Sequence, residues 1–435
     1  MEKKTGNEKI KEFFKNHSEN KFFNYEEKMN STGMNYKSNI LEKEGTITNS
    51  NILMNKTSTC FNKTNNKKIY KGQYLNKLKH GKGILYYDDN SIQYEGDFIN
   101  DIFQGNGKYF YENGEYYIGQ FFNGGKHGKG IIYYKDGNIK YDGDFFNDKK
   151  QGNGKFIYED GDYYIGKWFN NQRNGKGILY NKNGSIQYEG EFFNDNFHGK
   201  GKLINEDGRY YIGQFFNNFM HGKGILYRKD GTIEYDGEFF KNDFHGQGKY
   251  IYEDGSYYNG ERFNDKKNGK GILYYENGSI QYEGDFSNGV PHGNGKYIYE
   301  NGEYYIGEWF DGYKNGKGKM YYNNGNLKYD GDFSNDVFQG IGKYIDENGE
   351  YYIGPWDDDL KNGSGTQYYA DNRIKYKGDF IDGSFHGNGT FFFENGDYYI
   401  GQWFNNLKHG KGIMYNKEGK VKYEGLFIED KYIKK

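Results

Sequence analysis

Eight of the nine histidines occupy one sequence register, immediately before a Gly-x-Gly motif. His198, His221 and His245 recur at intervals of 23 and 24 residues, which raises the question of a metal site. Other copies of the register carry Gln or Asn, and zinc does not accept Gln in place of His. Histidines one hairpin apart also lie about 10 Å from each other, too far to share an ion. We therefore expect no metal site, and expect these polar side chains to hydrogen-bond the loop backbone. The histidines are His80, His127, His198, His221, His245, His292, His386 and His409, and the amides are Gln104, Gln151, Asn174, Asn268, Asn315, Gln339 and Asn362.

A second repeated group is the lysine inside Gly-Lys-Gly. If these lysines share a face, they form a positive row able to contact anionic lipid head groups or an acidic partner. The simpler interpretation is a solvated face that discourages edge-to-edge pairing. We favour the solvated face because the repeat region is acidic. Residues 1–69 carry 13 Lys and 8 Glu, a net charge of +5, so the rest of the chain must carry −7 to give the total of −2. The lysines are Lys82, Lys129, Lys176, Lys200, Lys223, Lys270, Lys317 and Lys411.

Other patterns resemble chemical sites only superficially. The string Gly-Lys-His-Gly-Lys-Gly at 125–130 lacks the Ser or Thr and the following helix of a phosphate-binding loop. The acidic run 357–359 lacks the spacing of a calcium-binding EF-hand. Catalysis needs a unique constellation, which a repetitive chain does not offer. We expect no enzymatic activity, no cofactor and no small-molecule substrate, and no nucleic-acid binding because the repeat region is acidic.

The elements that position these residues are defined by an internal period. Tyr-x-Gly recurs sixteen times at alternating spacings of 24 and 23 residues, so the true unit is a 47-residue pair. Fifteen units are full and the sixteenth is partial, which defines a repeat array over 70–435. The tyrosines are Tyr70, Tyr94, Tyr117, Tyr141, Tyr164, Tyr188, Tyr211, Tyr235, Tyr258, Tyr282, Tyr305, Tyr329, Tyr352, Tyr376, Tyr399 and Tyr423.

Each unit reads as strand, loop, strand and turn. In the unit beginning at Tyr235, large and polar residues alternate over 235–239 and again over 246–252, which predicts two strands. A loop containing Asn242 and His245 joins them, and Asp254-Gly255 marks a hairpin turn. Units stacked in sequence predict an extended, twisted antiparallel sheet, about 150 Å long for fifteen hairpins at about 4.8 Å per strand.

Two finer expectations concern glycine and register. Gly in Tyr-x-Gly faces the same side as the rings, so we expect an aromatic ring from a neighbouring strand to cover it, and both glycines of Gly-x-Gly to be covered likewise. We also expect the turn to absorb the extra residue of the 24-residue units, so that turn type alternates while register does not. Pro355 is expected to weaken or bend its strand, and Arg262 stands where other units carry Phe or Trp.

The pattern of Tyr-x-Gly-x-Phe/Trp, a short polar loop and Gly-x-Gly resembles the MORN (membrane occupation and recognition nexus) repeat over residues 70–427. The resemblance implies an all-β, elongated meander of about fifteen stacked hairpins and a binding or scaffolding role. It also implies links to membranes, phosphoinositides, the cytoskeleton or flagella, and elongated homodimers formed through the C-terminal repeats in some members. The binding role, the membrane and cytoskeletal links and the homodimers are implied by the resemblance and do not follow from the periodicity.

The remaining expectations come from composition. The chain starts without an apolar segment and has one cysteine, Cys60, so we expect a cytoplasmic protein without disulfides. Residues 1–69 are expected to form a disordered tail, apart from a short helix at Glu8–Phe14. We expect a non-catalytic scaffold that organises protein partners at a membrane-associated or flagellar cytoskeleton. The alternative is a peripheral membrane protein that binds anionic phospholipids or phosphoinositides through the lysine row.

Overall fold

The computed structural model describes residues 69–434. The expectations for the tail, including the helix at Glu8–Phe14, lie outside these residues. Every regular element between 69 and 434 is a β-strand, and no helix in this range could cross a membrane. The chain divides into two compact units, Met1–Tyr210 and Tyr211–Lys435, and each is described separately. The predicted all-β meander is confirmed in each of them.

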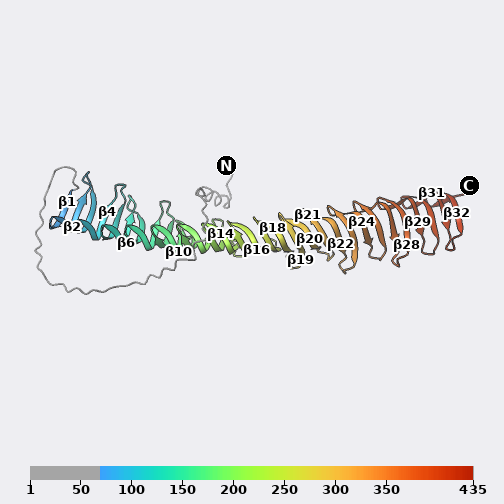
Figure 1. The fold of residues 1–435 in the computed structure, drawn as a ribbon, viewed down its shortest axis with the longest axis horizontal. Helices are drawn as coiled ribbons and strands as arrows, with labels where there is room; N and C mark the ends of the chain where they lie inside the picture. The colour runs from blue at the N-terminus through green and yellow to red at the C-terminus, as the bar shows by residue number, and fades with distance from the viewer. Residues whose placement is uncertain (1–68, 435) are drawn as a thin grey trace, which may run out of the picture. The chain divides into compact units, whose positions relative to one another are not determined.

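In the first unit each strand pairs antiparallel with the next one along the chain (Figure 1). Its strands are β1 (Tyr70–Leu75), β2 (Leu78–Tyr86), β3 (Ile92–Ile99), β4 (Ile102–Phe110), β5 (Tyr116–Phe122), β6 (Gly125–Tyr133), β7 (Ile139–Phe146), β8 (Lys149–Ile157), β9 (Tyr163–Phe169), β10 (Gln172–Tyr180), β11 (Ile186–Phe193) and β12 (Asn196–Ile204).

The second unit repeats this meander, and it includes all but the first residue of β13. Its strands are β13 (Tyr210–Phe216), β14 (Phe219–Tyr227), β15 (Ile233–Phe240), β16 (Asp243–Ile251), β17 (Tyr257–Phe263), β18 (Lys266–Tyr274), β19 (Ile280–Ser287), β20 (Val290–Ile298), β21 (Tyr304–Phe310), β22 (Tyr313–Tyr321), β23 (Leu327–Ser334), β24 (Val337–Ile345), β25 (Tyr351–Asp357), β26 (Leu360–Lys361), β27 (Gly363–Tyr368), β28 (Ile374–Ile381), β29 (Ser384–Phe392), β30 (Tyr398–Phe404), β31 (Leu407–Tyr415), β32 (Val421–Ile428) and β33 (Lys431–Ile433).

The connection inside each hairpin is shorter than the sequence predicts. Between β3 and β4 it consists of Asn100 and Asp101 alone, and both have positive φ (49° and 70°), as a type I′ turn requires. Asn and Asp tolerate this backbone better than other non-glycine residues. His245 was placed in the loop, and this was wrong: β16 begins at Asp243, so His245 lies in a strand.

The second connection is the same in the 23- and 24-residue units, so the prediction of alternating turn types was wrong. The N–H of Tyr252 bonds the carbonyl of Ser256 in a short unit, and the N–H of Tyr275 bonds that of Ser279 in a long one. The extra residue instead forms a β-bulge beside the turn. In β18–β19 the partners change from Tyr274↔Ile280 to Leu273↔Tyr282, which leaves Gln281 without an opposite residue.

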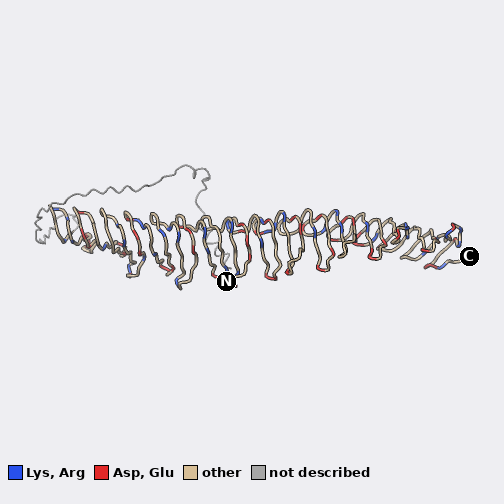
Figure 2. The backbone as a smooth tube through the Cα atoms, turned by 90° about the horizontal axis from the view of Figure 1, so that it is seen from below, with Lys and Arg blue, Asp and Glu red and all other residues tan. Residues whose placement is uncertain are grey.

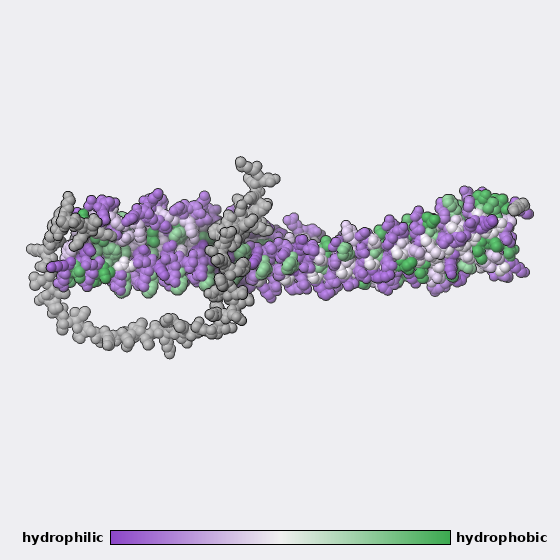
Figure 3. All heavy atoms as spheres, turned by 45° about the horizontal axis from the view of Figure 1, so that its top comes forward, coloured by the Kyte–Doolittle hydropathy of each residue, from purple (hydrophilic) through white to green (hydrophobic). Residues whose placement is uncertain are grey.

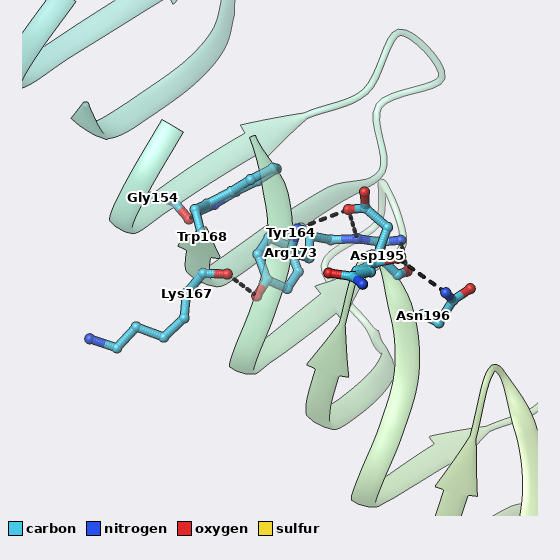
Figure 4. Close-up of polar contacts among 8 residues, drawn as sticks. Gly154, Tyr164, Lys167, Trp168, Arg173, Asp195 and Asn196 are labelled. Carbon is cyan, nitrogen blue, oxygen red and sulfur yellow. Dashed lines mark hydrogen bonds and ion pairs between the residues drawn. The ribbon is translucent and has the colours of Figure 1, made fainter. Parts of the chain in front are cut away.

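The core is a tyrosine ring lying across a pair of glycines on neighbouring strands. Gly96 and Gly107 are opposite each other, and a Cβ on Gly96 would lie 2.6 Å from the Cα of Gly107. The ring of Tyr94 covers both, and its hydroxyl donates to the carbonyl of Asp97 at 3.0 Å. The covering ring therefore comes from the same strand for the first glycine and from the neighbouring strand for the second. Fifteen tyrosines make this hydrogen bond to the third residue on, at 2.8 to 3.1 Å (Figure 4 shows Tyr164).

The two glycines of Gly-x-Gly have different roles, contrary to the prediction. Gly107 lies under the ring, whereas Gly105 has φ of 64° and belongs to a bulge. The register places Gly96 opposite Gly107 but Asp97 opposite Gln104. Gly105 and Asn106 of β4 therefore have no opposite residue in β3 and form the bulge. The Asp97 carboxylate accepts a bond from the N–H of Asn106 in this bulge at 3.3 Å.

Aromatic contacts link successive hairpins into a continuous core. In the first unit five covering tyrosines meet the edge of the Phe or Trp of the following hairpin, with ring centroids 4.9 to 5.4 Å apart: Tyr70, Tyr94, Tyr117, Tyr141 and Tyr164. In the second unit Arg262 takes the aromatic place, with its guanidinium carbon 4.7 Å from the Tyr250 ring and Nη1 donating to the Asp265 carbonyl. A planar cation can replace a ring here because it also stacks on aromatic faces.

The C-terminal end of the array shows that both strands of a hairpin are needed to bury its tyrosine. Tyr423 begins the partial sixteenth unit, whose second strand β33 has only three residues. Its side chain is 48% exposed, whereas Tyr94 is fully buried. Pro355 was expected to weaken or bend its own strand, but β25 is continuous over Tyr351–Asp357. The interruption lies instead in the following strand, which is divided into β26 and β27.

Neighbouring hairpins are further joined at their type I′ turns. The Asp101 carboxylate accepts from the N–H of Lys79 at 2.9 Å, and the N–H of Asp101 donates to the Lys79 carbonyl at 3.0 Å. Asp thus has two roles at this position: it adopts the positive φ of the turn, and its carboxylate accepts the hydrogen bond from the neighbouring hairpin. The first hairpin, which has no described hairpin before it, carries Lys77 at this position instead.

We predict that Gly331→Ala destabilises the second unit by about 1–3 kcal/mol, the usual range for overpacking. The new Cβ would lie 2.6 Å from the Gly342 Cα, and this backbone cannot move without breaking the pairing. Gly325→Asn is the matched control, because nothing lies within 4 Å of its Cβ position and Asn372 has φ of 67° at the equivalent turn position. Thermal unfolding followed by circular dichroism measures both, and equal midpoints would contradict the proposed role of the glycine pair.

We predict that the array loses stability above about pH 10. Burial raises the pKa of Tyr70, Tyr235 and Tyr399 from 10.0 to about 12 and that of the other covering tyrosines further. A raised pKa means that folding favours the neutral ring, so its contribution is complete below pH 10 and is lost as pH rises through 12.

Denaturant titrations across this pH range, with phenolate absorbance read in parallel, measure the effect. The covering tyrosines should ionise only as the circular dichroism signal is lost. Ionisation of all tyrosines near pH 10 with an unchanged fold would refute the prediction.

Candidate binding surface

The face opposite the tyrosine core, here called the outer face, carries the residues that alternate with Tyr, Gly and Phe along each strand. Because side chains alternate across a sheet, Ile118, Gln120 and Phe122 of β5 lie on this face. Positively and negatively charged residues are interspersed along both units (Figure 2). Within each unit the outer face contains three rows of side chains that run across the strands.

The first row contains the eight lysines singled out in the sequence, and all of them are exposed. Four form ion pairs with an Asp of the next strand, at 2.5 to 2.9 Å: Lys82–Asp97, Lys129–Asp144, Lys270–Asp285 and Lys317–Asp332. Lys176 and Lys223 lie opposite Glu191 and Glu238, and Lys411 lies opposite Leu426. The row therefore brings together alternating charges rather than a purely positive stripe.

These aspartates are held from two sides. Asp144 accepts from Lys129 and also from the N–H of Asn153 at 2.9 Å, in the bulge of its own hairpin. The hydrogen bond from Lys270 lowers the pKa of Asp285 in the same arrangement. Because the bulge orients the carboxylate, the neutralising charge is a fixed part of each of these hairpins.

The second row, here called the isoleucine row, consists of the middle residue of Tyr-x-Gly and the residues opposite it. Across β5 to β8 it reads Ile118, Ile131, Asp142 and Lys155, and the next four strands repeat it. Six isoleucines of this row are 40–45% exposed: Ile118, Ile165, Ile212, Ile306, Ile353 and Ile400. The apolar pair, acid and base of β5–β8 thus recur in β9–β12, about 19 Å further on. In the second unit the row also varies, since Asn259 lies opposite Ile272, Lys319 opposite Ile306 and Thr366 opposite Ile353.

The lysines of this row are positioned by aromatic rings. Lys108 lies 4.5 Å from the ring centroid of Tyr116, which stacks on Tyr133 at 4.6 Å with nearly parallel planes. The same stack of Lys on two tyrosines recurs at Lys155 and Lys249. The charged part of the isoleucine row is therefore as regularly placed as the apolar part.

The third row, here called the phenylalanine row, contains the residue before each type I′ turn. In the first unit it includes Ile99, Phe122, Phe146, Phe169 and Phe193, and these are 46–55% exposed. In the second it includes Phe216, Phe240, Phe263, Phe310 and Phe404, with Ser287, Ser334 and Asp357 at the intervening positions. On the face drawn in Figure 3, hydrophobic residues recur between hydrophilic ones along each unit.

The histidines lie between members of this third row. His127 packs between Phe122 and Phe146, with ring centroids 5.4 and 5.1 Å away. Among residues 69–434 no three His, Cys, Asp or Glu side chains are grouped so as to hold a metal ion. At the same register Gln104 accepts from the N–H of Asn123 in the next type I′ turn at 3.1 Å, so the predicted bond to loop backbone is confirmed for this glutamine. For four of the histidines it was wrong, because their buried Nδ1 atoms have no hydrogen-bond partner in the described part of the chain: His80, His127, His245 and His386.

The isoleucine and phenylalanine rows were not predicted from the sequence. Their members alternate with the core residues at period two, so the outer face could be recognised only after each strand was assigned. The signal was present in the recurring Tyr-Ile-Gly and Phe-Phe-Asn strings. The bulges set the register between neighbouring strands, and this register decides which of those residues lie side by side.

Comparison with solved structures adds no argument about fold or function. The chain is similar to a protein of unknown function from Bacteroides caccae (16% identity over 60% of this chain and 93% of that one, TM-score 0.14). It is also similar to the computationally designed protein Ika8 (12% identity over 74% of this chain and 95% of that one, TM-score 0.13). No curated protein matches the chain.

The family model of the MORN repeat matches fifteen consecutive segments between residues 70 and 420. The matches follow the 24- and 23-residue spacing, and each opens at the Tyr of Tyr-x-Gly. Together they cover most of the sequence, and the hairpins described above are the structural form of these segments. The chain belongs to the MORN repeat family.

Proposed function

We propose that this protein is a non-catalytic scaffold that binds protein partners along its outer face. MORN repeats are generally linked to scaffolds that bind membranes or proteins, and arrays of this kind are generally non-catalytic. The observation that supports a protein-binding role here is the isoleucine row, in which an exposed isoleucine, a half-buried isoleucine, an acid and a base recur across β5–β8 and again across β9–β12. Apolar contacts supply binding energy and the flanking charges select the partner.

Repetition is the second support. Because this set of side chains recurs after about 19 Å in the first unit, that unit offers two equivalent sites at a defined spacing. A partner with several binding segments gains affinity by engaging more than one of them. Catalysis needs a unique arrangement, whereas here the outer residues are repeated from hairpin to hairpin. A location at a membrane-associated or flagellar cytoskeleton is also part of the proposal, and this part rests on the family alone.

We predict that changing Ile118, Ile165 and Ile306 to Asn reduces partner capture by the full chain at least tenfold. Asn259 occupies the equivalent place, so Asn is compatible with this part of the hairpin. Affinity capture followed by quantitative mass spectrometry compares this variant with the natural chain. Lys135→Asn with Lys182→Asn, two changes at exposed turn positions, is the control. Undiminished capture by the isoleucine variant would contradict the proposal.

The alternative is direct binding of anionic phospholipids, and the observation in its favour is the 71–82% exposure of the four ion-paired lysines. The ion pairs of these lysines argue against direct lipid binding. Each of these lysines already has a carboxylate partner, so a lipid phosphate would have to compete with a fixed Asp. We therefore propose lipid binding only as the second candidate.

Vesicle flotation separates the two candidates. We expect the natural chain not to float with phosphoinositide vesicles, and expect salt-sensitive flotation to appear when Asp97, Asp144, Asp285 and Asp332 are changed to Asn. Gln73 accepts the bulge N–H at the equivalent register, so an amide is compatible with the fold. Flotation of the natural chain, lost when Lys82, Lys129, Lys270 and Lys317 become Glu, would favour the lipid candidate.

A further inference from the structure

The second residue after a type I′ turn lies on the core face, in most hairpins opposite an aromatic residue, as Lys314 lies opposite Trp309. In five hairpins this residue is a cation held by the Asp of the next turn. The Asp carboxylate accepts from the backbone N–H of the cation at 2.9 Å and lies 3.3 to 4.0 Å from its side-chain nitrogen (Figure 4 shows Arg173 and Asp195). The pairs are Lys79–Asp101, Lys126–Asp148, Arg173–Asp195, Lys314–Asp336 and Lys408–Asp430.

Lys267 occupies this register without the acid. The next turn carries Gly289 where the five other turns carry Asp, and a Cβ at Gly289 would meet nothing within 4 Å. The Lys267 ammonium lies 5.9 Å from the Tyr258 ring centroid and 5.4 Å from that of Phe286. The corresponding distances for Lys314 are 5.9 and 5.8 Å. The two ammonium groups are therefore placed alike, but the position of the carboxylate is open beside Lys267.

A second cation adds to the charge at this position. Arg262 lies directly opposite Lys267, at the register where Trp309 faces Lys314. Arg262 is 7% exposed, and its Nη1 donates to the uncharged carbonyl of Asp265. Its buried Nε has no hydrogen-bond partner within residues 69–434. Burial lowers the pKa of Lys267, and the positive charge of Arg262 lowers it further. An anion beside Lys267 is therefore favoured by two cations.

Two other lysines at this register lack the Asp, but acids act on both of them. Asn171 accepts from the N–H of Lys150 at 2.8 Å. Burial lowers the pKa of Lys150 and of Lys361, whereas the charge of Asp195 acts in the opposite direction on the first and that of Asp346 on the second. The open, positively charged position is thus assigned to the β17–β18 hairpin of the second unit.

We propose that the open position beside Lys267 binds the carboxylate of an Asp or Glu side chain of a partner protein. The carboxylate takes the place that Asp336 has beside Lys314, and accepts from the backbone N–H and the ammonium of Lys267. A charge pair of this kind selects the partner more than it adds affinity. The inference rests on the proposed function, because it names one chemical group of the protein partner, but it uses the core face and not the isoleucine row.

Amide NMR of the full chain with isotope-labelled lysine tests the proposal, because the Lys267 N–H is itself one of the donors. The probe is the tripeptide acetyl-Gly-Glu-Gly-amide, and the same peptide with Gln in place of Glu is the matched neutral probe. The Glu probe should shift the Lys267 resonance in a saturable way and leave that of Lys314 in place. The Gln probe should shift neither. Lys267→Met identifies the resonance, and Met220 occupies the same register, so this variant is expected to fold.

Two variants alter the site itself. Gly289→Asp supplies the carboxylate from the chain and should raise the dissociation constant of the Glu probe at least tenfold. Asp336 holds the same turn position with φ of 75°, so the variant is expected to fold, and circular dichroism checks this. Arg262→Phe removes the second cation and should also weaken binding of the Glu probe.

Gly312→Asp is the matched control. It adds the same charge at the same turn position, but its N–H bonds the carbonyl of Pro291, which has neither a charge nor an N–H of its own. The dissociation constant of the Glu probe should stay within twofold of that of the natural chain.

Four results would overturn the proposal. The first is the lack of a saturable shift at Lys267, and the second is an equal shift with the Gln probe. The third is a dissociation constant that Gly289→Asp leaves unchanged. The fourth is tighter binding of the same tripeptide with phosphoserine in place of Glu, which would assign the position to phosphate. Partner capture by the isoleucine variants is measured separately, so failure of either proposal can be recognised without the other.

Discussion

A tyrosine ring lying flat across two glycines on neighbouring strands is the contact on which the rest of this structure depends. The two glycine Cα atoms approach so closely that a Cβ on either would meet the ring or the opposite backbone. The space left by the two hydrogens is filled by the ring, and the hydroxyl is satisfied by a carbonyl three residues further on. A large side chain with a polar end can be fully buried in this way at a single-layer sheet.

This contact also determines which residues remain available for binding. Tyrosine, glycine and phenylalanine of each strand are committed to the core face, so every alternate residue is displayed on the outer face. The hairpins repeat, and the displayed residues therefore form rows rather than isolated sites. Where a row carries charge, as for Lys129 and Asp144, the next strand supplies the opposite sign. Where it is apolar, as for Phe146, the turn leaves it half exposed.

Irregularities in the backbone make this regularity possible. The bulge at Gly105 and Asn106 places an N–H where the Asp97 side chain can accept it, and so connects the outer face to the backbone. The bulge at Gln281 absorbs the odd residue of a long unit and returns the next tyrosine to the core face. Without these devices a change of one residue would reverse the faces of every following strand.

The sequence by itself determined the family, the all-β meander and the residues of the core, because Tyr-x-Gly and Gly-x-Gly leave only one face on which rings and glycines can meet. It also indicated the bond from Gln104 to the turn backbone, but not that buried histidines at the same register, such as His127, leave Nδ1 without a partner among the described residues. It did not reveal that His245 lies in a strand, that only the second glycine of Gly-x-Gly is covered, or that bulges rather than turns absorb the extra residue. These depend on φ and on cross-strand register, which are set when strands pair. The lysine row was visible in the sequence, but its aspartate partners were not, since Lys129 and Asp144 become neighbours only through the tertiary register.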